Sequence, residues 1–257
     1  MMRYMVMAGT SDARRIIEEL STRNVKILAT ATTHHGSELA RTSGADEVLT
    51  GRFDSLKLSE IINTHSVDVL IDATHPFASE ATRNAVKAAD KEGIKYIRFE
   101  RPFSNIPDNH LLYKVNSFPE AVEEILKLTT IDDRIFHLAG VMTLPYLTEK
   151  IDPEQIVARI LPSTFSIKKC KDLGVPARNI IAMEGIFSKE FNKALMNEYS
   201  ISLVITKDSG EAGGTSSKID AAMELEIPVV MVVRPEVKEL RGKLVLNNLE
   251  DVIRELK

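Results

Sequence analysis

Short runs rich in Val, Ile and Leu alternate with longer amphipathic runs along this chain, and no other feature constrains its fold as strongly. Runs that are apolar throughout are typical of parallel strands buried on both faces. Their alternation with helical patterns predicts an α/β fold with mainly parallel sheets. The expected strands are residues 4–7, 26–29, 69–71, 96–99, 113–115, 135–138, 157–160, 180–182, 203–205, 229–233 and 244–246. The expected helices are residues 11–20, 56–63, 77–92, 118–128, 164–173, 189–197, 216–226 and 249–256.

About eleven strands are expected, which is more than a single sheet usually contains. Two smaller sheets suit a chain of 257 residues better than one wide sheet. Residues 102–110 (PFSNIPDNH) are polar, include prolines and show no periodicity, so they are the best candidate linker. We therefore expect one domain over residues 1–110 and a second over residues 111–257.

Charge and cysteine content narrow the classes of protein to which the chain can belong. The net charge of −4 disfavours a dedicated nucleic-acid binder. The single cysteine, Cys170, excludes an intramolecular disulfide and a cysteine-cluster metal site. No apolar run approaches the ~20 residues of a membrane span, and the N-terminal apolar stretch is too short for a signal peptide. We expect a soluble, cytoplasmic protein without a nucleic-acid or membrane partner.

The turn after the first strand is a candidate phosphate site, because ligands of open parallel sheets bind beyond the carboxyl ends of the strands. Gly9 permits a tight turn, and Thr10 and Ser11 open a helix whose free N–H groups suit an anion. The full G-x-G-x-x-G fingerprint is absent, so an ordinary capped turn is the alternative.

The stretch after the second strand, residues 29–35 (ATATTHH), carries no acidic residue. Because an acid at this point often binds the ribose of NADH, the sequence does not choose between NADH and NADPH. The pair His34-His35 is predicted to be a polar loop, with a metal or phosphate contact as the alternative.

The third and fourth strands are also followed by polar residues. Thr74 and His75 precede Pro76, which suits the first turn of a helix, so these residues either cap that helix or serve the site. The side chain of histidine ordinarily titrates near neutrality, as proton transfer requires. Arg101 follows the fourth strand and can bind a carboxylate in a forked geometry, or can form an intramolecular pair with Glu100 or a neighbour.

The strongest local signal is the glycine-rich stretch over residues 206–218 (TKDSGEAGGTSSK). Glycines at this point let the backbone approach an anion closely. Lys207 and Lys218 add positive charge, and Ser209 adds a donor. A flexible linker is the alternative, but it would not stand between a buried strand and an amphipathic helix. The Gly-Lys-Ser/Thr ending of a Walker A loop is missing.

Two other chemical patterns receive little support. Tyr146 and Lys150 match the Tyr-x-x-x-Lys pair of short-chain dehydrogenases, but Pro145 and Pro153 flank the long helix that this pair requires. The histidines show no ligand spacing, so no protein-bound metal is expected.

Several stretches taken together resemble the precorrin-6A reductase family of cobalamin biosynthesis, including its cobalt-precorrin-6A branch. The resemblance spans nearly the whole chain. The stretches are Gly9-Thr10 with residues 12–14, then 72–78 (DATHPFA), 98–102 (RFERP), 159–162 (RILP), 184–188 (EGIFS), 206–214 with Lys218, and 227–235 (IPVVMVVRP).

The resemblance implies two Rossmann-like domains with an interdomain cleft, and a reductase that needs NADPH or NADH but no flavin. It implies hydride transfer to a C=C bond of (cobalt-)precorrin-6A, with a proton added at the neighbouring carbon. The tetrapyrrole is then the partner, with other enzymes of the corrinoid pathway as further candidates. The predicted catalytic residues are His75 and Lys207.

The remaining residues of the expected site fall into two groups. The predicted cofactor-binding residues are Gly9, Thr10, Ser11 and Thr74. The predicted substrate-binding residues are Arg101, Ser209, Gly210, Gly213, Gly214 and Lys218. Two departures weaken the match: Ala8 replaces a glycine that is common in the family, and residues 137–143 (HLAGVMT) lack a basic residue that many relatives have.

Two other functions stay open from the residues alone. A different Rossmann-type oxidoreductase would use Tyr146 and Lys150. A non-enzymatic sensor of a nucleotide or tetrapyrrole would bind its ligand without oxidising a cofactor.

Overall fold

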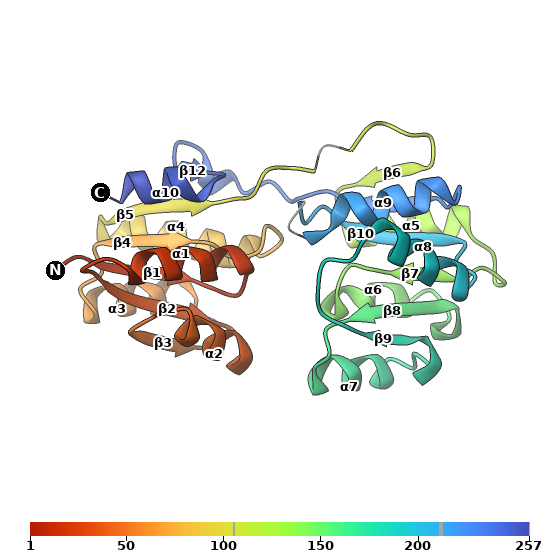
Figure 1. The fold of residues 1–257 in the computed structure, drawn as a ribbon, viewed down its shortest axis with the longest axis horizontal. Helices are drawn as coiled ribbons and strands as arrows, with labels where there is room; N and C mark the ends of the chain where they lie inside the picture. Colours follow the sequence, from red (N-terminus) through yellow and green to blue (C-terminus); the bar gives the residue numbers. More distant parts are fainter. Residues whose placement is uncertain (105, 211–212, 257) are drawn as a thin grey trace. The chain divides into compact units, whose positions relative to one another are not determined.

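The computed structural model of the chain describes residues 1–104, 106–210 and 213–256. The chain forms two compact units (Figure 1). Unit 1 consists of Met1–Pro102 and Glu236–Lys257, and unit 2 of Phe103–Pro235. Within the described residues each unit has one six-stranded sheet in which every strand pair is parallel. The predicted α/β class with parallel sheets is confirmed.

The sheet of unit 1 has the strand order β12-β5-β4-β1-β2-β3, which is that of a Rossmann fold. Its strands are β1 (Arg3–Met7), β2 (Lys26–Ala31), β3 (Glu47–Thr50), β4 (Val69–Asp72), β5 (Lys95–Phe99) and β12 (Leu244–Leu246). Its helices are α1 (Ser11–Ser21), α2 (His34–Thr42), α3 (Ser55–Thr64), α4 (Ser79–Glu92) and α10 (Leu249–Glu255).

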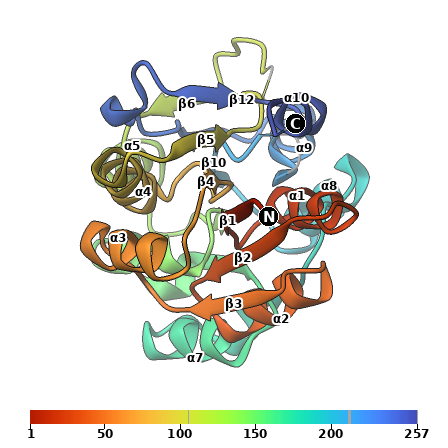
Figure 2. The same ribbon diagram turned by 90° about the vertical axis from the view of Figure 1, so that its left-hand side faces the viewer.

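Side chains that alternate along the strands of unit 1 form one apolar core on each face of its sheet. Tyr4 and Val6 face α1, α2 and α10, whereas Met5 and Met7 face α3 and α4. Figure 2 shows these two helical layers on opposite sides of the sheet. Burial on both faces explains why the strands are continuously apolar in the sequence.

The sheet of unit 2 has the order β6-β11-β10-β7-β8-β9. Its strands are β6 (Leu112–Val115), β7 (Ile135–His137), β8 (Ile156–Ile160), β9 (Ile180–Ala182), β10 (Leu203–Lys207) and β11 (Val229–Val232). Its helices are α5 (Phe118–Leu128), α6 (Leu144–Thr148), α7 (Thr164–Asp172), α8 (Lys189–Glu198) and α9 (Thr215–Glu224). The five strands from β7 to β11 repeat the order of β1 to β5, and β6 takes the edge position that β12 takes in unit 1.

The unit boundaries differ from the expected domains 1–110 and 111–257. Unit 2 ends at Pro235, and the remaining chain returns to unit 1. There β12 pairs with β5, with Leu244 opposite Ile97, and the phenol of Tyr4 donates to the carbonyl of Leu256 at 3.2 Å. Strand β12 thereby covers the outer edge of β5, which would otherwise expose unpaired backbone N–H and C=O groups.

Two elements near the start of the chain were not expected. Instead of a polar loop, His34 and His35 begin α2, and β3 follows that helix. Only Ser37 and Ala40 of α2 are buried, and only Val48 of β3, because both elements lie at the edge of the sheet. With so few buried side chains, neither element shows the repeating spacing of apolar residues by which helices and strands are recognised in a sequence.

No helix in the described part of the chain is both long and apolar enough to cross a bilayer.

Candidate functional site

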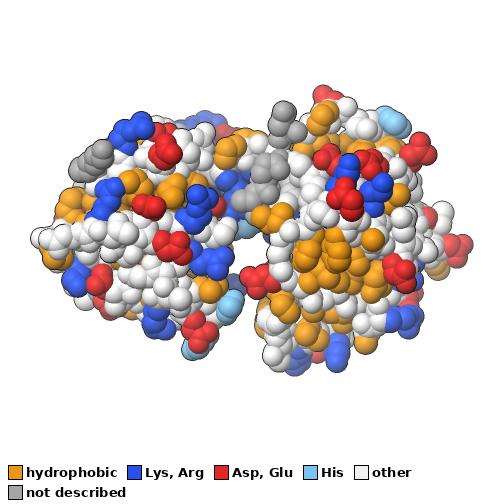
Figure 3. Space-filling view, viewed as in Figure 1, with side chains coloured by type: hydrophobic (Ala, Val, Ile, Leu, Met, Phe, Trp, Pro, Cys, Tyr) orange, Lys and Arg blue, Asp and Glu red, His pale blue; other side chains and the backbone are white. Residues whose placement is uncertain are grey.

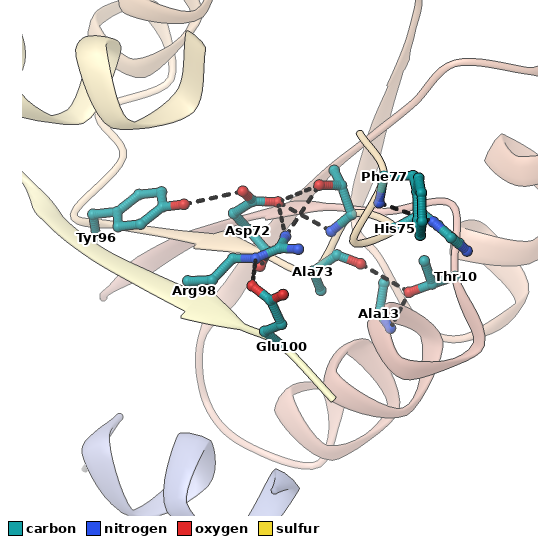
Figure 4. Close-up of polar contacts among 10 residues, drawn as sticks. Thr10, Ala13, Asp72, Ala73, His75, Phe77, Tyr96, Arg98 and Glu100 are labelled. Carbon is teal, nitrogen blue, oxygen red and sulfur yellow. Dashed lines mark hydrogen bonds and ion pairs between the residues drawn. The ribbon is translucent and has the colours of Figure 1, made fainter. Parts of the chain in front are cut away.

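The strand order of unit 1 reverses between β1 and β4, and open parallel sheets bind their ligands at such a point. The turn after β1 contains Gly9, Thr10 and Ser11. The turn after β4 contains Thr74 and His75. The structure therefore brings the predicted cofactor-binding residues and one predicted catalytic residue to the same edge of one sheet. Figure 4 shows Thr10 and His75 at this edge.

Thr10 joins these two turns directly. As the N-cap of α1, its Oγ1 accepts a hydrogen bond from the N–H of Ala13 at 3.1 Å, and it donates to the carbonyl oxygen of Ala73 at 2.8 Å. Gly9 has a φ of +118°, which side-chain-bearing residues rarely adopt. The first turn of α1 consequently presents free N–H groups and the positive end of the helix dipole at the switch point, as a bound phosphate requires.

A buried ion pair holds the turn after β4. Asp72 Oδ1 accepts from the N–H of Thr74 at 3.0 Å, from its hydroxyl at 2.7 Å, and from Arg98 Nη1 at 2.9 Å. The phenol of Tyr96 donates to Asp72 Oδ2 at 3.0 Å. Burial and the Asp72 carboxylate raise the pKa of Tyr96, so this phenol stays protonated and remains a donor. Figure 4 shows Tyr96 and Arg98 meeting at Asp72. This network holds Thr74 directly after Ala73, whose carbonyl oxygen accepts from Thr10 in the turn after β1.

His75 is partly buried and shapes the same turn. Its Nδ1 accepts a hydrogen bond from the N–H of Phe77 at 3.2 Å, and the two rings lie 5.9 Å apart. Since Nδ1 is an acceptor in this bond, the neutral imidazole carries its proton on Nε2. His75 thus has a local structural contact in addition to its predicted catalytic role.

Arg101, predicted to bind substrate, has a partner in unit 1. Its guanidinium pairs with Asp12 in the first turn of α1, and its Nε lies 2.9 Å from Asp12 Oδ2. This is the intramolecular pair that the sequence left open as the alternative.

A pocket of about 770 Å³ opens in unit 1. It adjoins Ala8, which directly precedes the turn of Gly9, Thr10 and Ser11. Its walls are the carboxyl ends of β1 and β2, the turns after β3 and β4, and the first turns of α4. Thr74 lines it, together with two arginines, Arg52 and Arg83, and two acids, Asp54 and Glu80. Its volume is in the usual range for small-molecule sites, roughly 300–1,000 Å³.

Unit 2 has an equivalent switch point between β7 and β10. The glycine-rich stretch follows β10, where the N–H of Ser209 donates to Thr215 Oγ1 at 3.1 Å and the N–H of Gly213 donates to the carbonyl of Gly210 at 2.9 Å. Gly210 and Gly214 have φ values of +72° and +65°, so the turn needs glycine at both positions. Residues 211 and 212 of this predicted anion-binding stretch lie outside the described residues.

Three cations gather at this edge of unit 2. Burial lowers the pKa of Lys207 to about 8. Burial, and then the charges of Arg159 and Lys207, lower the pKa of Lys218 to about 7. The sequence predicted both lysines, but it did not single out Arg159 on β8, which appeared there only within a family motif.

His137, at the end of β7, is a further titratable group at this edge. It is fully buried, and its Nε2 lies 2.9 Å from the hydroxyl of Thr143, which itself donates to the carbonyl of Gly140. His137 Nε2 is therefore the donor in its own bond. Burial, and then the charge of Lys207, lower the pKa of His137 to about 3, so this imidazole is neutral at physiological pH.

The Tyr146 and Lys150 pair finds no support in the structure. Helix α6 ends at Thr148, before Lys150, and the ring of Tyr146 stacks on Phe118 with centroids 5.6 Å apart. No cluster of His, Cys, Asp or Glu that could hold a metal ion occurs among the residues described.

Comparison with known proteins identifies the family. The family model for precorrin-6x reductase CbiJ/CobK matches residues 3–257. A cobalt-precorrin-6A reductase of Methanothermobacter thermautotrophicus is 50% identical over 253 residues, which cover 98% of this chain and 82% of the relative. One of Methanocaldococcus jannaschii is 37% identical over 237 residues, which cover 92% of each protein.

A solved structure supports the fold assignment. The structure of a CobK precorrin-6A reductase matches with a TM-score of 0.78 at 23% identity, over 100% of this chain and 96% of the other. This match shows a shared fold of two parallel-sheet units. Together with the family model over nearly the full chain, it leads to the conclusion that this chain belongs to the precorrin-6x reductase family.

Proposed function

We propose that the chain reduces one C=C bond of precorrin-6A or cobalt-precorrin-6A with a nicotinamide nucleotide, NADPH or NADH. The observation that carries this proposal is the 50% identity to a cobalt-precorrin-6A reductase over 98% of the chain. The geometry of unit 1 agrees with it, because a helix N-terminus, a positive-φ glycine and a pocket meet at one switch point.

The cofactor would lie on unit 1. Gly9, Thr10 and Ser11 would bind its phosphates through backbone N–H groups at the start of α1, with Thr74 beside them. The nicotinamide supplies the hydride, so the protein needs to bind, orient and shield the reactants rather than provide a nucleophile. The ion pair between Asp72 and Arg98 supports this part of the site by holding Thr74.

The substrate would contribute carboxylates, which suit the cationic edge of unit 2. Lys207 and Lys218 would bind them together with Ser209 and the backbone of Gly210, Gly213 and Gly214. Arg101 would add a further contact if it exchanged Asp12 for a substrate carboxylate. His75 and Lys207 are the candidates to polarise the substrate and deliver the proton that accompanies the hydride.

The experiment that tests this function follows cofactor oxidation at 340 nm by the purified protein. NADH and NADPH are each combined with metal-free and with cobalt-containing precorrin-6A. Turnover with one pair identifies the reaction, the cofactor and the branch of the pathway together. Absence of turnover with every pair, from folded protein that still binds a tetrapyrrole, would favour a sensor instead.

A further inference from the structure

A buried ion pair of unit 2 contacts both segments by which the chain passes between the units. The chain enters unit 2 within residues 98–104, the first connecting segment, and returns to unit 1 within residues 233–236, the second. On the side of unit 2 shown in Figure 3, acidic and basic side chains stand at the surface. By contrast, the paired side chains of Asp208 and Arg234 are only 7% and 2% exposed, with Arg234 Nε 3.5 Å from Asp208 Oδ2. Because a buried ion pair adds little net stability by itself, the segments that it holds together indicate its role.

Asp208 lies in the glycine-rich stretch, directly after β10, and fixes the course of that stretch. Its N–H donates to the carbonyl of Val232 at 3.0 Å, which continues the pairing of β10 with β11. Its Oδ1 accepts from the N–H of Gly210 at 3.1 Å, a bond from the side chain to the backbone two residues on that closes a turn. The carboxylate of Asp208 thus sets the direction in which the stretch leaves the sheet.

The same ion pair holds the first connecting segment. Asp208 Oδ1 also accepts from the hydroxyl of Ser104 at 3.1 Å. The guanidinium carbon of Arg234 lies 4.4 Å from the centre of the Phe103 ring. Phe103 is 69% exposed, so its ring packs on the guanidinium at the surface and not in the apolar core. Each side chain of the pair therefore contacts one residue of this segment.

Arg234 itself belongs to the second connecting segment. Its Nε donates to the carbonyl oxygen of Asp208 at 3.1 Å, so the guanidinium holds the backbone of this residue as well as its carboxylate. Pro235 follows directly and ends unit 2. The glycine-rich stretch and both connecting segments consequently meet at Asp208.

In unit 1 the first connecting segment starts from the candidate cofactor site. Arg98 Nη1 donates to the hydroxyl of Thr74 at 3.1 Å, and Arg101 pairs with Asp12 in the first turn of α1. The segment therefore contacts the turns of that site near its start and Asp208 at its end. A continuous chain of covalent bonds and packed side chains of this kind is a physical route for coupling between two sites.

We propose that Asp208 is a positioning residue that couples the glycine-rich stretch of unit 2 to nucleotide binding in unit 1. Its contacts with Ser104 and Arg234 make the course of the stretch depend on the connecting segments. A nucleotide bound at the turns that Arg98 and Arg101 contact thereby orders the stretch for the ligand of unit 2. The identity of both ligands rests on the proposed function.

The test follows amide hydrogen exchange in the full-length protein by mass spectrometry, without and with saturating NADPH or NADH. In the wild type we expect the nucleotide to slow exchange within residues 206–210 at least about fivefold. Ser104→Ala removes the bond from the first connecting segment and leaves that from Gly210. The ratio of the exchange rates without and with nucleotide should then fall to about one, while the Kd for the nucleotide, measured by calorimetry, stays within about twofold of the wild type. A merely structural role would speed exchange in both states and leave the ratio unchanged.

Two substitutions of Asp208 test the carboxylate itself. Asp208→Ala removes the acceptor for both Ser104 and Gly210, so the protection by nucleotide should be lost. Asp208→Asn keeps a side-chain oxygen that accepts both bonds and should retain part of the protection.

Thr130 offers a matched control. Its hydroxyl also donates to a carboxylate of unit 2, Asp133 Oδ2 at 2.9 Å, but in the turn that precedes β7, at the opposite, amino-terminal edge of the sheet. Thr130→Ala should keep the ratio of the wild type. The proposal is overturned if the nucleotide binds to the wild type without protecting residues 206–210, if Ser104→Ala keeps the full protection, or if Thr130→Ala loses as much.

Full protection in Ser104→Ala would mean that the nucleotide touches the glycine-rich stretch directly. Failure of the proposed function has a different signature, because the nucleotide would then protect the stretch in the wild type but would not be oxidised with precorrin-6A. A protein that binds neither nucleotide in calorimetry would overturn both proposals.

Discussion

Arg98 and Asp72 stand directly opposite each other on the paired strands β5 and β4, and their side chains are 2% and 0% exposed. Asp72 ends β4, and Thr74 lies two residues further along in the turn that follows. Both side chains contact the Thr74 hydroxyl, Arg98 at 3.1 Å and Asp72 at 2.7 Å. A buried ion pair contributes little net stability by itself, but it is costly to break. Its position therefore indicates that it holds the turn at the switch point in one conformation.

Removing Arg98 should destabilise the protein strongly. Arg98→Met leaves the Asp72 carboxylate buried without its cation, and we expect a loss of about 3–5 kcal/mol in the free energy of unfolding, measured in urea. The double variant Asp72→Asn with Arg98→Met should lose less than the sum of the single changes. Tyr96→Phe is the control, because it removes one hydrogen bond to Asp72 and leaves the contacts of Thr74 in place, and it should cost about 1–3 kcal/mol. A loss below about 1 kcal/mol in Arg98→Met would contradict this account of the pair.

Replacing Thr10 should weaken cofactor binding more than it weakens the fold. Thr10→Ala removes the N-cap of α1 and the bond to Ala73, with an expected stability cost of about 1–2 kcal/mol. Since that bond connects the two turns at the switch point, we also expect an at least about tenfold higher Kd for the nicotinamide nucleotide, measured by calorimetry. Ser117→Ala, which removes the N-cap of α5 in unit 2, should cost similar stability and leave this Kd unchanged. Equal Kd values in the two variants would remove Thr10 from the site.

Two substitutions of His75 separate its structural contact from its predicted catalysis. The side-chain oxygen of Asn can accept the N–H of Phe77 in place of Nδ1, but an amide cannot transfer protons as an imidazole does. We expect His75→Asn to keep the stability and cofactor Kd of the wild type while kcat falls about 100-fold or more. His75→Ala should lose stability as well. Full turnover in His75→Asn would mean that His75 only shapes the turn.

Rising pH should weaken substrate binding while it stabilises the free protein. The pKa values of Lys218, about 7, and Lys207, about 8, lie below the ordinary lysine value of 10.5. Each side chain therefore loses its charge as the pH rises through its own pKa value, and the affinity for a polycarboxylate tetrapyrrole should fall. Over the range between those values and 10.5 the unfolded chain binds more protons than the native protein, so the free energy of unfolding should rise with pH.

Lys218→Arg tests this sign, because arginine stays charged over the whole range. Uroporphyrin, a tetrapyrrole with a carboxylate-bearing side chain at every peripheral position, serves as the probe. The variant should show a flatter decline of uroporphyrin affinity between about pH 6.5 and 9, measured by fluorescence titration. An affinity of the wild type that rises with pH would show that neither lysine meets a carboxylate.

Much of the fold was predictable because most elements carry their own local signal. The strands β1 and β10 are apolar on both faces, and α5 begins with the N-cap Ser117 and repeats its apolar residues at helical spacing. The elements α2 and β3 have no such signal, since one edge helix and one edge strand bury few side chains. The assignment of residues 236–257 to the second domain was wrong because β12 pairs with a strand that is far away in the sequence.

The sequence by itself determined the class of fold, the family and the turns that carry the candidate site. These follow from periodicity, turn chemistry and motif spacing, which depend on residues close together in the chain. Only the tertiary structure decided which of these turns meet, through the strand orders that bring Thr10 to Ala73 and Gly140 near Lys207. It alone placed Arg98 against Asp72, because the partner of a buried charge is chosen by the packing of distant segments and not by its neighbours in sequence.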